Sequence, residues 1–74
     1  MRDLVIAVDL GGTQLRAALY DADLQVLVRH AGPTHADEGV AGVVGRLMAA
    51  VRAMGEEAGW ERIAAVGVSA PGPP

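Results

Sequence analysis

One stretch of the chain decides its fold: Leu4-Val5-Ile6-Ala7-Val8-Asp9-Leu10-Gly11-Gly12-Thr13. Residues 4–8 are apolar on both faces, which predicts a strand that is covered on both sides. Asp9 bounds this strand, and the pair Gly11-Gly12 predicts a tight turn behind it. We therefore expect a buried first strand whose end leads directly into a second strand.

Two more strands are predicted after this turn. Residues 15–20 alternate, with Leu15, Ala17 and Leu19 on one face. Asp21-Ala22-Asp23 predicts a second turn, and residues 24–30 alternate more weakly. Three strands joined by short turns predict an antiparallel meander, and the charged side chains of the third strand are typical of a sheet edge.

A helix is predicted in the second half of the chain. Gly32-Pro33 is expected to end the third strand, and Thr34 to cap the helix, with Asp37 and Glu38 in its first turn. Gly59 is expected to end it. Apolar residues at spacings of three and four predict that the helix is amphipathic; they are Val40, Val43, Val44, Leu47, Met48, Val51 and Met54.

A last strand is predicted over residues 63–68, an apolar run with β-branched side chains. The order is then β-β-β-α-β, an α/β fold in which a right-handed crossover places the last strand parallel to the first. In that arrangement the last strand has no partner on its far side, and one face of the sheet has no helix. We expect a further segment or another chain to cover both.

The composition excludes several classes of protein. The chain has 74 residues, 51% of them hydrophobic, and no cysteine, so it is one domain at most, without disulfides or thiolate zinc sites. A domain this small is marginally stable, which predicts a part of something larger or a homo-oligomer. The net charge is −3 and no basic patch exists, so no nucleic-acid partner is expected. Without a membrane span or a signal peptide, a cytoplasmic protein is expected.

The turn after the first strand carries the candidate chemistry. Gly11 and Gly12 let backbone amides approach phosphate oxygens, and Thr13 adds a hydroxyl donor. Asp9, at the end of a buried strand, can hold Mg²⁺ through water. A Gly-Gly pair between two strands, taken alone, is more often a plain hairpin turn.

Two motifs resemble those of a known family. Asp9-Leu10-Gly11-Gly12-Thr13-Gln14-Leu15-Arg16 resembles the first phosphate motif of the actin-like ATPase superfamily, which includes hexokinase. More narrowly, it is similar to the ROK family (repressors, open reading frames and kinases), which includes bacterial glucokinases. Val66-Gly67-Val68-Ser69-Ala70-Pro71-Gly72-Pro73 also resembles this family. The resemblance implies a ribonuclease H-like fold, of which residues 1–74 would be a partial N-terminal lobe.

The resemblance also implies roles for residues. The activity would be transfer of the γ-phosphoryl group of ATP to a hexose hydroxyl, with Gly11, Gly12 and Thr13 at the phosphates and Asp9 facing Mg²⁺. Arg16 matches the family's arginine, and would either steady the loop or pair with a carboxylate. Gly72 would touch the sugar through its backbone, or Pro71-Gly72-Pro73 would be only a rigid turn.

Other parts of the family's machinery do not occur in these residues. The family's catalytic aspartate lies in an Asn-Asp motif further along, followed by a zinc motif, so we expect no catalytic residue here and no kinase activity of this chain alone. We expect the N-terminal segment of a longer kinase. Two alternatives remain: a fragment of a sugar-responsive ROK repressor, although Met1 leaves no room for a preceding helix-turn-helix, and a non-catalytic fragment that dimerises. The sugar is open, as is the donor, ATP or polyphosphate.

Overall fold

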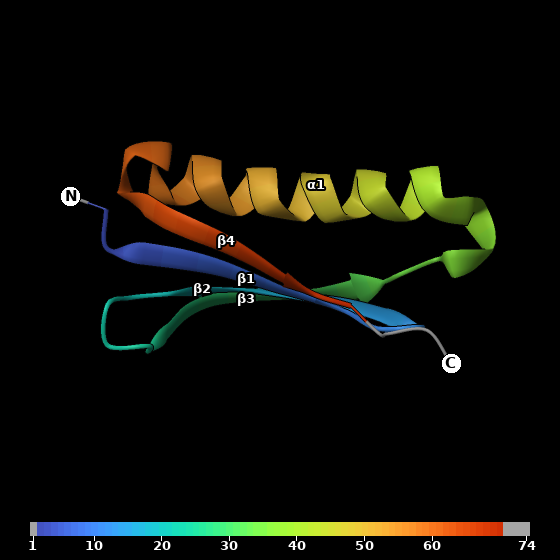
Figure 1. Ribbon diagram of the computed structural model, residues 1–74, viewed down its shortest axis with the longest axis horizontal. Coiled ribbons are helices and arrows are strands. Elements are labelled where there is room, and N and C mark those ends of the chain that lie inside the picture. Colours follow the sequence, from blue (N-terminus) through green and yellow to red (C-terminus); the bar gives the residue numbers. More distant parts are fainter. Residues whose placement is uncertain (1, 71–74) are drawn as a thin grey trace.

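The computed structural model of the chain describes residues 2–70 and forms two layers, with one helix across one face of a sheet (Figure 1). The elements are β1 (Leu4–Leu10), β2 (Gln14–Tyr20), β3 (Val26–Pro33), the 3₁₀ turn η1 (Ala36–Glu38), α1 (Gly39–Ala58), the 3₁₀ turn η2 (Trp60–Arg62) and β4 (Ile63–Ser69). The α/β class and the predicted order β-β-β-α-β are confirmed.

The sheet has four strands in the order β3-β2-β1-β4. β1 pairs antiparallel with β2, and β2 with β3, which confirms the meander. The crossover through α1 brings β4 parallel to β1, as expected. In the described part of the chain β3 and β4 are the edge strands, so the predicted edge position of the third strand is also confirmed.

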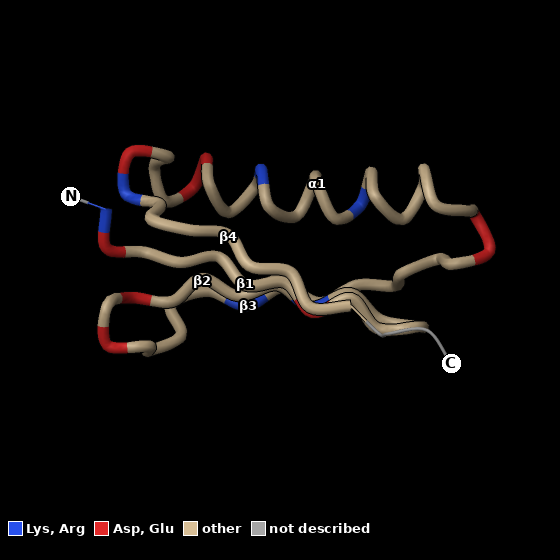
Figure 2. Tube along the Cα trace, in the orientation of Figure 1, with Lys and Arg blue, Asp and Glu red and all other residues tan. Residues whose placement is uncertain are grey.

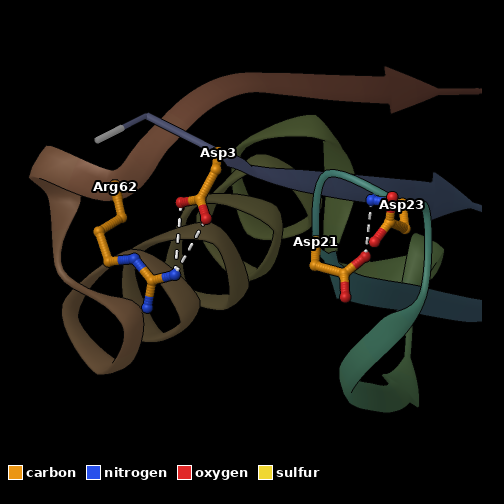
Figure 3. A network of polar contacts seen from close by, with 4 residues as sticks. All are labelled: Asp3, Asp21, Asp23 and Arg62. Atoms are coloured by element: carbon orange, nitrogen blue, oxygen red, sulfur yellow. Dashed lines mark hydrogen bonds and ion pairs between the residues drawn. The ribbon is translucent and has the colours of Figure 1, made fainter.

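The third strand differs from its predicted bounds at both ends. It begins at Val26 because Leu24 lies in the preceding turn with a left-handed φ of 62°. The Asp21 carboxylate holds this turn, since its Oδ1 accepts the backbone N–H of Asp23 (Figure 3) and that of Gln25, at 2.9 Å each. At the other end the strand runs through Pro33 instead of stopping at Gly32-Pro33. An edge strand tolerates proline because the missing N–H is not needed by a second neighbour.

The predicted helix cap is wrong. α1 begins at Gly39, after η1, with Glu38 at its N-cap and no side-chain capping hydrogen bond. Thr34 lies before η1, and its hydroxyl donates to the carbonyl of Gly11 in the loop between β1 and β2. The C-terminal end follows the prediction: Gly59 has φ 93°, which suits glycine, and its N–H donates to the Gly55 carbonyl.

The core lies between the sheet and the C-terminal half of α1. Its buried residues are Leu4, Ile6, Val8, Leu15, Ala17, Leu19, Val51, Met54 and Ile63. Met54 is 1% exposed, whereas Val40 and Met48 of the predicted apolar stripe are 80% and 51% exposed. Figure 1 shows the cause, because α1 and the sheet diverge toward the N-terminal end of the helix. Only the C-terminal part of the apolar stripe is therefore buried against the sheet.

Large apolar side chains are also exposed on β4. Val66 and Val68 are exposed, and their register with Ile6 and Val8 places them on the face that carries α1. Within residues 2–70 nothing pairs with the outer edge of β4, and no helix covers the second face of the sheet. These are the two uncovered surfaces expected from the element order. The helices of this described range also include none long and apolar enough to cross a membrane.

Two glycines of α1 lie in opposite environments. A Cβ at Gly45 would meet nothing, whereas a Cβ at Gly55 would overlap the indole of Trp60, which covers the helix end. Gly45→Ala should therefore raise the free energy of unfolding by about 1 kcal/mol. Gly55→Ala should lower it by about 1–3 kcal/mol, because the indole must move. Urea denaturation of both variants measures this, and equal shifts for the two would contradict the described packing.

One ion pair ties the start of β1 to the turn before β4. Arg62 Nη2 lies 3.2 Å from Asp3 Oδ2 (Figure 3), and its hydrogen bond lowers the pKa of the Asp3 carboxyl. A lowered pKa means that this contribution to stability is present above the pKa of the unfolded chain and is lost as the pH falls through the folded pKa. Arg62→Ala should raise the pKa of Asp3 toward its usual value, as followed by NMR titration. An unchanged pKa would mean that the pair does not form in solution.

Candidate functional site

The candidate site lies where β1 and β4 both end. The two strands are parallel, so their carboxyl ends meet at the same edge of the sheet, and Asp9 is the register partner of Ser69. Asp9 is also the partner of Arg16 on β2. Since cross-strand partners share a face, these three exposed side chains form one row on the face without a helix. In open α/β sheets ligands bind beyond the carboxyl ends of the strands.

Gly11 is required by the turn itself. Its N–H donates to the carbonyl of Gln14 at 2.8 Å, which closes the hairpin. A Cβ at Gly11 would lie 2.9 Å from the same carbonyl oxygen, which is closer than real Cβ atoms approach. The amide of Gly11 is therefore used by the fold and is not available to a ligand.

Gly12 and Thr13 are the residues of the loop that face outward. Both are exposed, and in the part of the chain that the structure describes no acceptor takes their backbone N–H groups or the Thr13 hydroxyl. A Cβ at Gly12 would meet nothing within 4 Å, so packing does not require glycine there. The glycines with left-handed φ between residues 2 and 70 are Gly39 and Gly59. The loop therefore lacks the left-handed residue of an anion nest and offers two amides and a hydroxyl instead.

Thr34 is the residue that the sequence interpretation missed. It is only 3% exposed, and its Oγ1 donates to the carbonyl of Gly11 at 2.9 Å. Its backbone N–H donates to the carbonyl of Thr13 at 3.0 Å. The usable signal was the register of the meander, because β3 continued past Pro33 places Thr34 opposite Thr13.

Arg16 points along β2 toward the loop. Its Nη2 donates to the side-chain oxygen of Gln14 at 3.1 Å. The ion pairs formed within residues 2–70 are Arg46–Glu38 and Arg62–Asp3, so neither Arg16 nor Asp9 takes part in one there. This geometry favours the first of the two predicted roles of Arg16, steadying the loop. Few charges lie along the strands, as Figure 2 shows. Asp9 and Arg16 form the second cross-strand pair from the loop, after Leu10 and Leu15.

Asp9 fits the way in which Mg²⁺ is usually held beside phosphates. Across the described residues no group of three or more His, Cys, Asp or Glu side chains could hold a metal ion. Mg²⁺ needs no such cage, because it keeps several waters and takes one or two carboxylates plus substrate phosphates. The exposed Asp9 carboxylate, near the end of β1 and just before the loop, provides such a donor.

A shallow hollow of about 550 Å³ lies on the face without a helix. Small side chains on neighbouring strands leave this space, and Asp9, Arg16 and Ser69 border it at the loop end. The residues that line it are Ala7, Val8, Asp9, Arg16, Ala17, Ala18, Tyr20, Arg29, His30, Ala31 and Ser69. A ligand held at the loop would therefore have room beside Asp9 and Arg16.

The predicted sugar-binding residue, Gly72, lies outside the described residues. The structure thus brings together Asp9, Gly11, Gly12, Thr13 and Arg16 at one edge of the sheet. A comparison of the chain with protein-family models finds no match, and a comparison with curated proteins finds none either.

Proposed function

We propose that this chain supplies the phosphate-binding loop of an ATP-dependent sugar kinase of the ROK type. In this proposal Gly12 and Thr13 bind phosphate oxygens of ATP, and Asp9 faces a Mg²⁺ ion. The chain would form part of the N-terminal lobe of a ribonuclease H-like fold, and the kinase would work in the cytoplasm on a hexose.

One observation carries the proposal: Gly12 is a glycine that the fold does not need. Gly11 is explained by the nearby Gln14 carbonyl, but a Cβ at Gly12 would stand in open space. A plain hairpin turn would accept a side chain there. A glycine at this position leaves the backbone open to the close approach of a ligand. In this proposal the exposed N–H groups of Gly12 and Thr13 are the donors to an anion.

The charged residues beside the loop support the same chemistry. Mg²⁺ bound through Asp9 would offset the negative charge that phosphates bring near this carboxylate. The guanidinium of Arg16, bonded to Gln14, adds positive charge on the same face. Both groups would position the phosphates, and neither is placed as the base that takes the proton of the sugar hydroxyl.

The uncovered apolar surfaces support the proposal that the chain is one part of a larger lobe. Val40 and Met48 of α1 and Val68 of β4 are large apolar side chains that remain about half or more exposed. Large apolar side chains exposed on two neighbouring elements are often covered in the functional protein. The proposed cover is a further part of the kinase.

The test is an NMR titration of the isotopically labelled chain with Mg-ATP. The amides of Gly12 and Thr13 should shift, whereas those of Asp23 and Gln25, in the turn at the other end of β2, should not. Addition of a hexose should cause no ATP consumption, because the chain is expected to hold no catalytic base. The proposal fails if Gly12 and Thr13 do not respond, or if this chain alone phosphorylates the sugar.

A further inference from the structure

We infer that Thr34 is the positioning residue of the phosphate loop, an inference that rests on the proposed function. Thr34 follows β3 and is separated from Gly11 by 23 positions in the sequence. It nevertheless grips the loop at two points, through its hydroxyl on the Gly11 carbonyl and through its N–H on the Thr13 carbonyl. Both contacts are to carbonyl oxygens, so the N–H groups of Gly12 and Thr13 and the Thr13 hydroxyl, which are assigned to the phosphates, are left free of Thr34.

The planarity of the peptide bond explains how this grip acts on a ligand. The carbonyl of Gly11 and the N–H of Gly12 belong to the same peptide unit, and in a trans peptide they point in opposite directions. The described residues contain no cis peptide bond. When the Thr34 hydroxyl fixes the Gly11 carbonyl on one side, it therefore fixes the Gly12 N–H toward the other side.

The second grip holds the far end of the same loop. The Thr34 N–H fixes the Thr13 carbonyl, so the peptide unit between Thr13 and Gln14 is held as well. The peptide unit between Gly12 and Thr13 has no contact with Thr34, but it lies between two units that Thr34 fixes. A loop held in this way binds an anion without first losing conformational freedom, which is the main advantage of a preorganised site.

Because Thr34 is buried, its hydroxyl is the group that holds the Gly11 carbonyl in place. At 3% exposure its Oγ1 has no water to replace the Gly11 carbonyl as a partner. Valine has the same shape without the hydroxyl, and serine keeps the hydroxyl without the methyl group. Thr34→Val should therefore release the Gly11 carbonyl, while its backbone N–H still holds the Thr13 carbonyl, and Thr34→Ser should keep both contacts.

The first measurement is the order parameter of the Gly12 N–H in the chain without ligand. The wild-type value should be about 0.85, typical of rigid backbone, and Thr34→Val should lower it, although the remaining backbone hydrogen bonds keep the loop partly ordered. Thr34→Ser should stay close to wild type. Val51→Ala is the matched control, because it removes buried apolar contacts of α1 and lowers stability away from the loop. An unchanged value in Thr34→Val, or an equal fall in Val51→Ala, overturns the inference whether or not a nucleotide binds.

The second measurement is the affinity for Mg-ATP, taken from the shifts of the Gly12 and Thr13 amides. Thr34→Val should bind about fivefold more weakly, the equivalent of one net hydrogen bond. Thr34→Ser and the folded fraction of Val51→Ala should bind like wild type. Equal binding by Thr34→Val and wild type contradicts the positioning role alone. No response in the wild-type chain contradicts the proposed function, and the order parameters then still decide whether Thr34 fixes the loop.

Discussion

Replacing Met54 with Ala should lower the free energy of unfolding by about 2–5 kcal/mol. Met54 is 1% exposed and packs in the core with residues of the sheet, where its removal leaves a cavity. The core of the described chain is small, and a domain of this size has little stability in reserve. A large part of the Met54→Ala molecules should therefore be unfolded in water at room temperature.

The chain offers a matched control on the same helix. Met48→Ala removes the same atoms from a side chain that is 51% exposed, so its effect should stay within about 0.5 kcal/mol. Urea denaturation followed by circular dichroism measures both variants. Similar losses for the two would mean that the N-terminal half of α1 is packed in solution, for instance against a second copy of the chain, and would contradict the described exposure.

Replacing Gly12 with Val should abolish binding of Mg-ATP and leave stability within about 0.5 kcal/mol of wild type. A side chain at Gly12 meets no protein atom, so the fold should accept it. The same side chain fills the space through which phosphate oxygens would reach the backbone N–H groups of Gly12 and Thr13. Binding is thus blocked by volume, while the charges around the loop are unchanged.

Gly45→Val serves as the control for this substitution. Gly45 also has open space around its position, but it lies on α1, away from the loop. It should bind Mg-ATP like wild type, as measured by titration of the loop amides. If Gly12→Val binds equally well, the free space at Gly12 is not where the phosphates lie, and Gly12 is an ordinary turn residue.

The strands and their order could be predicted because their signals are local. The alternation of Leu15, Ala17 and Leu19 predicts the burial that the structure shows. The apolar run from Leu4 to Val8 correctly predicts a strand, but it also predicts cover on both sides, and residues 2–70 bury only the face of Leu4, Ile6 and Val8. The extent to which the helix is buried was harder to predict. An amphipathic period states which face is apolar, but the extent of burial depends on where the sheet diverges from the helix, and Val40 consequently remains exposed.

The candidate site was predictable only in part, because one of its residues is distant in the sequence from the others. Asp9, Gly12 and Thr13 lie in one short motif, whereas Thr34 acts on this motif from 23 positions away. A threonine followed by two acidic residues is typical of a helix start, and only the register of β3 against β2 assigns Thr34 to the loop. The sequence also does not distinguish Gly11 from Gly12. Only the folded loop shows that the Gln14 carbonyl requires glycine at position 11 and leaves position 12 open.

The central claim is that the amides of Gly12 and Thr13 bind the phosphates of a nucleotide. It is tested most directly by comparing three probes on the wild-type chain: Mg-ATP, inorganic triphosphate with Mg²⁺, and adenosine. Both triphosphates should shift the Gly12 and Thr13 amides, and adenosine should leave them unchanged. Loop amides that ignore triphosphate, or that respond equally to adenosine, would contradict the claim.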